Sequence, residues 1–171
     1  MGVYDLTGRK ALVTGGARGL GEGMAGALAR AGAAVVVGDV REDLGKACVG
    51  ALRDSGASAE FVSLDVTDDA SWDRAVPEAI GYLGGLDILV NNAGVEITSL
   101  LVDLDAEDAR RMLEVNVLGT ALGIKHGLRV MRPGGAAGGG APPRRGPGRA
   151  GRTPAGRRRG TGAGRDPAPA G

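Results

Sequence analysis

The sequence predicts an α/β fold in which parallel strands form a doubly wound sheet with helices on both faces. Short apolar runs alternate with longer segments whose apolar residues recur at helical spacing, and this alternation is typical of βαβ units. The apolar runs end in glycine-rich or polar turns. The pattern extends to residue 132 and then stops, so we predict one incomplete domain over residues 1–132 and a different segment over residues 133–171.

The first βαβ unit is expected between residues 9 and 39. Residues 9–14 (RKALVT) are predicted to form a strand, and a glycine-rich turn over residues 15–21 leads into a helix that ends near residue 31. Residues 34–38 (AVVVG) are wholly apolar, as burial between two helix layers requires. Asp39 follows at the carboxyl end of this strand. The expected buried face of the helix is Leu20, Met24, Ala27, Leu28 and Ala31.

The remaining elements continue the same alternation. Strands are predicted at residues 59–64 and 86–90, and helices at residues 42–55 and about 106–131, the last of them capped by Asp105. The expected apolar face of the helix at 42–55 is Leu44, Ala47, Cys48, Ala51 and Leu52. Between the two strands, a further helix is expected to contain Trp72, Val76 and Ile80.

The glycine-rich turn is the first candidate site. It reads TGGARGLG from Thr14 to Gly21 and lies between a predicted strand and a predicted helix. There, backbone amides and the helix dipole favour a pyrophosphate, and residues without side chains allow close approach. We expect the dinucleotide to contact Gly15, Arg18, Gly19, Leu20 and Gly21. The alternative is an ordinary loop.

Asp39 favours NAD over NADP as the cofactor. It follows Gly21 by 18 positions and ends the second predicted strand, where a carboxylate accepts hydrogen bonds from a ribose 2′-hydroxyl and repels a 2′-phosphate. Arg18 weighs weakly the other way, because a cation near the turn binds a 2′-phosphate. The alternative for Asp39 is a solvated strand-end acid or a helix cap.

Four motifs in order make residues 1–133 resemble the short-chain dehydrogenase/reductase family: Thr14-Gly-x-x-x-Gly-x-Gly21, Leu64-Asp65-Val66, Asn91-Asn92-Ala93-Gly94 and Asn116 within VNVLG. The resemblance implies a Rossmann-like sheet, here truncated to about four strands in the order 3-2-1-4. It implies hydride transfer between NAD(H) and a secondary alcohol or ketone. It also implies that Asp65 and Val66 flank the adenine, that Asn91, Ala93 and Gly94 lie beside the cofactor, and that Asn116 is the active-site asparagine.

The family's other catalytic residues have no counterpart in this sequence. Family members use a Tyr as general acid/base, a Lys four residues later and a Ser that orients the substrate. The tyrosines here are Tyr4 and Tyr82, and neither is followed by a Lys at that spacing. We therefore expect the chain to be inactive as an oxidoreductase; the alternative is a non-catalytic NAD-binding module.

Residues 133–171 differ in composition from everything before them. They contain only Ala, Gly, Pro and Arg apart from two Thr and one Asp, and eight Arg give them a positive charge. Ordering a backbone costs about 1–2 kcal/mol per residue, and this segment has almost no apolar surface to offset it, so we predict disorder. GC-rich codons read out of frame yield this composition, and we hypothesise a frameshift near residues 134–140. Nucleic-acid binding through the arginines is the less favoured alternative, because no aromatic accompanies them.

Several classes of protein are disfavoured. No apolar stretch approaches the roughly 18 residues of a membrane span, and no signal peptide is recognised. Cys48 and His126 are the only residues of their types, which argues against a disulfide or a zinc site and fits a cytoplasmic protein. His126 and Lys125 are expected to be exposed or packed structural residues. Family resemblance implies homo-oligomers built partly through the long helix, but its partner helix is absent here.

Overall fold

The computed structural model describes residues 4–131 of the 171-residue chain. The expectations for residues 133–171, including disorder and a frameshift, lie outside the described residues.

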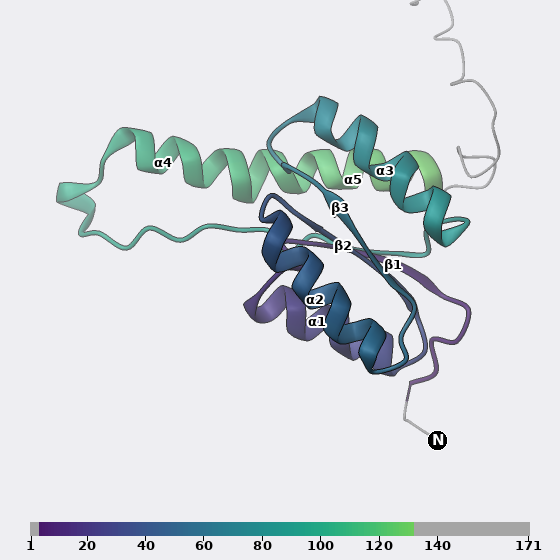
Figure 1. Cartoon of the computed structure of the whole chain (residues 1–171). Helices are drawn as coiled ribbons and strands as arrows, with labels where there is room; N and C mark the ends of the chain where they lie inside the picture. The colour runs from purple at the N-terminus through teal and green to yellow at the C-terminus, as the bar shows by residue number, and fades with distance from the viewer. Residues whose placement is uncertain (1–3, 132–171) are drawn as a thin grey trace, which may run out of the picture. The chain divides into compact units, whose positions relative to one another are not determined.

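A four-stranded parallel sheet forms the centre of the fold (Figure 1). Its strands are β1 (Lys10–Thr14), β2 (Ala34–Asp39), β3 (Ala59–Ser63) and β4 (Ile88–Val90). The order β3-β2-β1-β4 confirms the predicted order. In the register, Thr14 lies opposite Gly38, Asp39 opposite Ser63, and Val13 opposite Val90. The carboxyl ends of all four strands therefore lie along one edge of the sheet.

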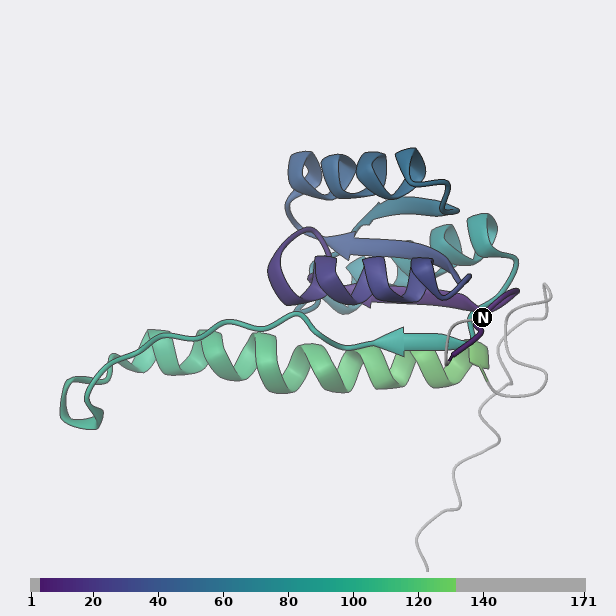
Figure 2. The same ribbon diagram turned by 90° about the horizontal axis from the view of Figure 1, so that it is seen from below.

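Helices cover both faces of the sheet (Figure 2). Helices α1 (Gly19–Arg30) and α2 (Glu42–Asp54) lie on one face. Helix α3 (Asp69–Leu83) lies on the other face together with the long helical segment at residues 106–131. The chain thus has the doubly wound arrangement that the alternating pattern predicts.

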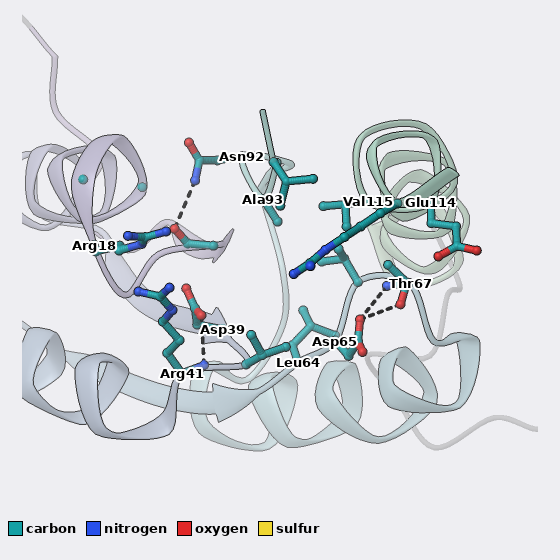
Figure 3. A pocket seen from close by; sticks show the side chains of 18 of the residues that line it. Arg18, Asp39, Arg41, Leu64, Asp65, Thr67, Asn92, Ala93, Glu114 and Val115 are labelled. Atoms are coloured by element: carbon teal, nitrogen blue, oxygen red, sulfur yellow. Dashed lines mark hydrogen bonds between the residues drawn. The ribbon is translucent and has the colours of Figure 1, made fainter. Parts of the chain in front are cut away.

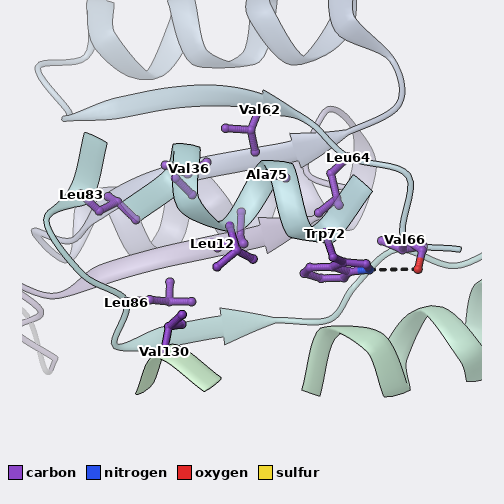
Figure 4. Close-up of a cluster of buried hydrophobic side chains, with 12 residues drawn as sticks. Leu12, Val36, Val62, Leu64, Val66, Trp72, Ala75, Leu83, Leu86 and Val130 are labelled. Atoms are coloured by element: carbon purple, nitrogen blue, oxygen red, sulfur yellow. Dashed lines mark hydrogen bonds between the residues drawn. The ribbon is translucent and has the colours of Figure 1, made fainter. Parts of the chain in front are cut away.

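The core is divided by the sheet into two clusters. The cluster beneath α3 contains Leu12, Val36, Leu64 and Trp72 and reaches Val130 near the end of the long helix (Figure 4). The other cluster joins the opposite sides of the strands to α1 and α2. Its buried members are Ala11, Val13, Ala25, Ala33, Val35, Val37, Cys48, Val49 and Ala59. Small residues predominate in this second cluster, so the two helices approach the sheet closely.

The predicted buried faces of α1 and α2 are wrong in part. Leu20 is 79% exposed and Met24 39% exposed, whereas Gly21, Ala25 and Gly26 form the buried side of α1. In α2 the buried residues are Gly45, Cys48 and Val49, and Leu44 faces solvent. Glycine carries no signal in a hydrophobicity pattern, yet it permits the closest contact with the sheet. The helices are therefore rotated toward their glycines.

The helix predicted at residues 106–131 is present but is not regular throughout. It consists of α4 (Ala106–Leu113), a π-helical segment η2 (Glu114–Gly119) and α5 (Thr120–Met131). Asp105 caps it as predicted, because its carboxylate accepts hydrogen bonds from the amides of Glu107 and Asp108. A short 3-10 turn, η1 (Leu101–Asp103), precedes it.

The two halves of this helix differ in burial. Helix α4 has no buried residue, whereas α5 buries Gly123, His126, Gly127 and Val130. Large apolar side chains are exposed along the helix: Leu113, Val117, Leu118, Ile124 and Leu128. Only the second half is therefore packed into the domain.

No helix within residues 4–131 combines the length and apolar character that crossing a membrane requires.

Replacement of Gly45 tests the close approach of α2. In Gly45→Ala the new methyl group would collide with the Phe61 ring, and we expect a loss of about 1–3 kcal/mol in the free energy of unfolding. Gly50→Ala on the same helix is the control, since a Cβ there meets nothing within 4 Å. It should stabilise by about 0.5–1 kcal/mol. Urea unfolding measures both, and equal effects of the two substitutions would contradict this packing.

Candidate functional site

A cavity of about 940 Å³ opens at the carboxyl ends of the strands (Figure 3). It is bounded by the glycine-rich turn, by the segments that follow β2, β3 and β4, and by α4 and the start of η2. The lining residues that the sequence predicted as cofactor contacts are Gly15, Arg18, Gly19, Leu20, Gly21, Asp39, Asp65, Val66, Ala93 and Gly94. The structure thus brings together segments that lie far apart in the chain.

The glycine-rich turn has a backbone path that its glycines make possible. Gly15 and Gly19 have φ values of 61° and 58°, a region that other residues rarely adopt. Gly21 lies in the first turn of α1, where a Cβ would collide with the Gly15 carbonyl oxygen and lie 2.5 Å from Asn92 Nδ2. The extended Arg18 at the N-cap provides no side-chain cap. The first amides of α1 have no carbonyl partner within the helix, so they are suited to bind an anion.

Hydrogen bonds from Thr14 and Asn92 fix the turn to the end of β4. The Thr14 hydroxyl donates to the Val90 carbonyl at 3.3 Å and accepts from the amides of Asn92 and Ala93, both at 3.1 Å. In return, the Asn92 side-chain amide donates to the carbonyl oxygens of Thr14 at 3.0 Å and Gly15 at 3.1 Å. The Thr14 hydroxyl therefore makes all the hydrogen bonds that it can form, and only 1% of the surface of this residue is exposed.

Asp39 is the last residue of β2 and is largely buried, with 9% exposure. One carboxylate oxygen accepts a hydrogen bond from the Ala17 amide at 3.1 Å, and the other accepts from the Arg41 amide at 3.0 Å. These bonds hold the carboxylate beside the glycine-rich turn, where it lines the cavity. Each oxygen retains capacity for a further hydrogen bond.

Asp65 and Val66 form the wall of the cavity that follows β3. The Asp65 carboxylate accepts hydrogen bonds from the Thr67 amide at 2.9 Å and the Thr67 hydroxyl at 2.7 Å, which closes a local turn. The Asp65 amide donates to the Ser71 hydroxyl at 3.0 Å. The Val66 carbonyl accepts from the indole N–H of Trp72, also at 3.0 Å (Figure 4). The start of α3 therefore supports this wall.

Asn91 and Asn116 lie close to the site but are not among the described residues that line the cavity. The Asn91 side chain lies against α5, where a Cβ on Gly123 would collide with its Oδ1. The Asn116 side chain accepts a hydrogen bond from the Val95 amide and donates one to the Val95 carbonyl, both at 2.9 Å. It therefore joins the π-helical segment to the chain that leaves β4.

Sequence analysis did not select several residues that line the cavity. Arg41 lies two positions after Asp39, the last residue of β2, and this closeness to a strand end was an available signal. A second group comes from the long helix: Glu107, Asp108, Arg110, Arg111, Glu114 and Val115. Nothing in the local sequence of this group indicates a site, because its position depends on how the helix crosses the domain. Thr14 and Asn92 belong to two of the sequence motifs, but the motifs do not predict the hydrogen bonds between these two residues.

The described residues contain no group of three or more His, Cys, Asp or Glu side chains placed to hold a metal ion. Cys48 packs behind the glycine-rich turn, with its sulfur 3.6 Å from the Gly16 carbonyl oxygen. Burial raises the pKa of the Cys48 thiol, with a smaller contribution from the charge of Glu22. A neutral thiol at this position is a packing residue.

Comparison with known proteins gives a consistent family. A sequence model described as short chain dehydrogenase matches residues 9–140. The chain is 42% identical over 130 residues to the 3-alpha-(or 20-beta)-hydroxysteroid dehydrogenase of Mycobacterium tuberculosis strain H37Rv, a match that covers 76% of this chain and 49% of that protein.

Solved structures agree with this match. A short-chain type dehydrogenase/reductase from Mycobacterium marinum superposes with a TM-score of 0.72 at 32% identity, over 75% of this chain and 52% of that one. A short chain dehydrogenase from Burkholderia cenocepacia, solved in complex with NADP, gives 0.70 at 35% identity, over 77% and 54%. The chain spans about half the length of the relatives it matches.

Replacement of Thr14 tests the junction between the turn and β4. Thr14→Val keeps the shape of the side chain but removes the hydroxyl from two amides and one carbonyl. We expect the free energy of unfolding to fall by about 1–3 kcal/mol. Thr98→Val, at an exposed position, is the control and should change it by less than about 0.5 kcal/mol. If urea unfolding finds Thr14→Val as stable as the control, the junction contributes no stability.

Proposed function

Because the chain belongs to the short-chain dehydrogenase family, we propose that residues 1–132 form a nucleotide-binding unit that holds NAD in the cavity at the carboxyl ends of the strands. Members of this family are oxidoreductases that bind NAD(P) and act on small molecules. Bound NAD supplies a hydride acceptor, and the residues around the cavity bind and orient it.

One observation carries the proposal: the uncapped amino end of α1 and the Asp39 carboxylate border the same cavity. A dinucleotide needs donors for its diphosphate and acceptors for its ribose hydroxyls. The turn is free of side chains where close approach is needed, since a Cβ on Gly15 would lie 2.8 Å from Ala93 Cα and one on Gly21 would meet Gly15. The residues present therefore fit the group.

The same geometry favours NAD over NADP. The Asp39 carboxylate is held in place by two backbone amides, and its negative charge opposes a 2′-phosphate while it accepts from a 2′-hydroxyl. Arg18 and Arg41 also line the cavity (Figure 3) and are the groups that would favour NADP. An NADP complex is known for the Burkholderia cenocepacia relative, so both cofactors need to be compared on this chain.

For this chain we propose binding without turnover. The reaction of the family converts a secondary alcohol to a ketone, and removal of the alcohol proton requires a general base. The sequence contains no Tyr followed four positions later by Lys. Asn116, the residue that matches the family's active-site asparagine, has both side-chain groups bound to Val95. These residues therefore support NAD binding, which the family shares, without catalysis of hydride transfer.

Titration of the full chain with NAD tests binding and turnover separately. We expect saturable binding by calorimetry, with a higher melting temperature at saturating NAD because a ligand that binds only the folded state stabilises it. With a panel of secondary alcohols, absorbance at the NADH wavelength should not rise above the protein-free rate. Absence of binding would overturn the nucleotide assignment, whereas chain-dependent formation of NADH would overturn only the proposed lack of turnover.

Asp39→Asn tests cofactor choice. The substitution removes the negative charge that accepts from the ribose, and a hydrogen bond to a charged group contributes about 1.5–3 kcal/mol. We expect NAD affinity to fall by about 10–100-fold and the NAD-to-NADP preference to decrease. Asp43→Asn, an exposed change on α2, should leave both affinities unchanged. A variant at Asp39 that binds both cofactors as the unaltered chain does would assign cofactor choice to other residues.

A further inference from the structure

His126 lies on α5 and is buried against α3, and it is not among the residues that line the cavity. Only 3% of its surface is exposed, and both ring nitrogens face carboxylates of α3. Nε2 lies 2.6 Å from an oxygen of Asp69, and Nδ1 lies 3.6 Å from an oxygen of Asp73. A charged ring has an N–H for each carboxylate, whereas a neutral ring has only one. Whether both ring nitrogens can donate to a carboxylate therefore depends on whether the His126 ring is protonated.

Two cations on α5 complete the charges around His126. Lys125 Nζ lies 2.6 Å from both carboxylate oxygens of Asp69, and Arg129 Nη1 lies 3.7 Å from Asp73. Hydrogen bonds from Lys125 and then from His126 lower the pKa of Asp69 to about 2. Asp69 is therefore ionised throughout the neutral range and faces the imidazole as a carboxylate.

The indole of Trp72 connects this cluster to the cavity. Its ring stacks on the imidazole, with centroids 5.8 Å apart and planes inclined by 8°. Its N–H donates to the Val66 carbonyl at 3.0 Å, and Trp72 itself is fully buried. On its other side, Val66 packs against the long helix so closely that a Cβ on Gly119 would lie 2.8 Å from Val66 Cγ2. The hydrogen bond from the Trp72 indole to the Val66 carbonyl therefore links the Val66 backbone to the His126 cluster.

We propose that His126 is a positioning residue for the nucleotide site: its charged ring, bound to Asp69 and stacked on Trp72, holds the indole that fixes Val66 at the cavity wall. This inference rests on the proposed function, because Val66 lines the cavity assigned to the dinucleotide. Loss of the ring proton leaves one carboxylate facing a nitrogen lone pair, which loosens the stack and the wall. NAD affinity is therefore higher when His126 is charged, and by linkage NAD favours the charged ring.

The sequence makes this coupling measurable. His126 is the only histidine and Trp72 the only tryptophan. NAD affinity is therefore compared at about pH 5.5 and about pH 8, on the two sides of the range in which histidine side chains in general change charge, and indole fluorescence reports on the stacked Trp72. NAD itself does not change its protonation in this range. For the full chain we expect NAD affinity to be about five-fold lower at the higher pH, with a fluorescence change over the same interval.

Three variants separate this role from a general loss of structure. His126→Gln should remove both pH effects. Leu128→Gln, an exposed change on α5, should keep them. Trp72→Phe retains an aromatic ring beside His126 but lacks the N–H that binds Val66, so calorimetry should find NAD affinity independent of pH in this range. It also serves as the second test if His126→Gln fails to fold.

The outcomes distinguish this inference from the proposed function. If the unaltered chain binds no NAD at either pH, the proposed function fails and the inference fails with it. If it binds NAD and the pH dependence is unchanged in His126→Gln or in Trp72→Phe, the nucleotide site stands and the positioning role of His126 is wrong. Loss of the pH dependence in both variants, with its retention in Leu128→Gln, supports the role.

Discussion

The candidate site depends on the hydrogen bonds between Thr14 and Asn92. Thr14 ends β1 and Asn92 follows β4, so the two residues belong to neighbouring strands whose loops diverge beyond them. The Thr14 hydroxyl accepts hydrogen bonds from the backbone amides of Asn92 and Ala93. The Asn92 side-chain amide donates to the backbone carbonyls of Thr14 and Gly15. A flexible glycine turn is thereby held in one conformation. This restraint fixes the backbone of a turn whose residues line the cavity, so less conformational freedom is left to lose when a ligand binds there.

Much of the fold follows from local sequence pattern, because strand and helix periodicity and turn residues are properties of short segments. The four strands and the capping of the long helix by Asp105 follow from such patterns, whereas the strand order was an implication of the family resemblance. The buried faces of α1 and α2 were not, because they are set by the sterics of Gly21 and Gly45 against the neighbouring backbone and ring. A pattern of hydrophobic residues alone predicts that Leu20 and Leu44 are buried, but both face solvent.

The site shows the same division. Residues at the carboxyl ends of strands, such as Asp39 and Asp65, could be located from sequence because parallel strands bring these ends together. The arginines of α4 could not, since their place at the cavity depends on a helix that crosses the domain far along the chain. The partners of Asn116 and His126 likewise lie on other elements, at Val95 and Asp69. Spacing within a motif identifies such a residue but not its contacts.

The long helix is unevenly buried, and its less buried half borders the cavity. Helix α5 is held by the sheet and α3, but α4 contributes no buried side chain and extends beyond the body of the domain (Figure 2). The π-helical segment lies between the two, with Asn116 of that segment bound to Val95. Few buried contacts therefore restrain α4, which forms one boundary of the cavity, so this boundary owes little of its stability to tertiary packing.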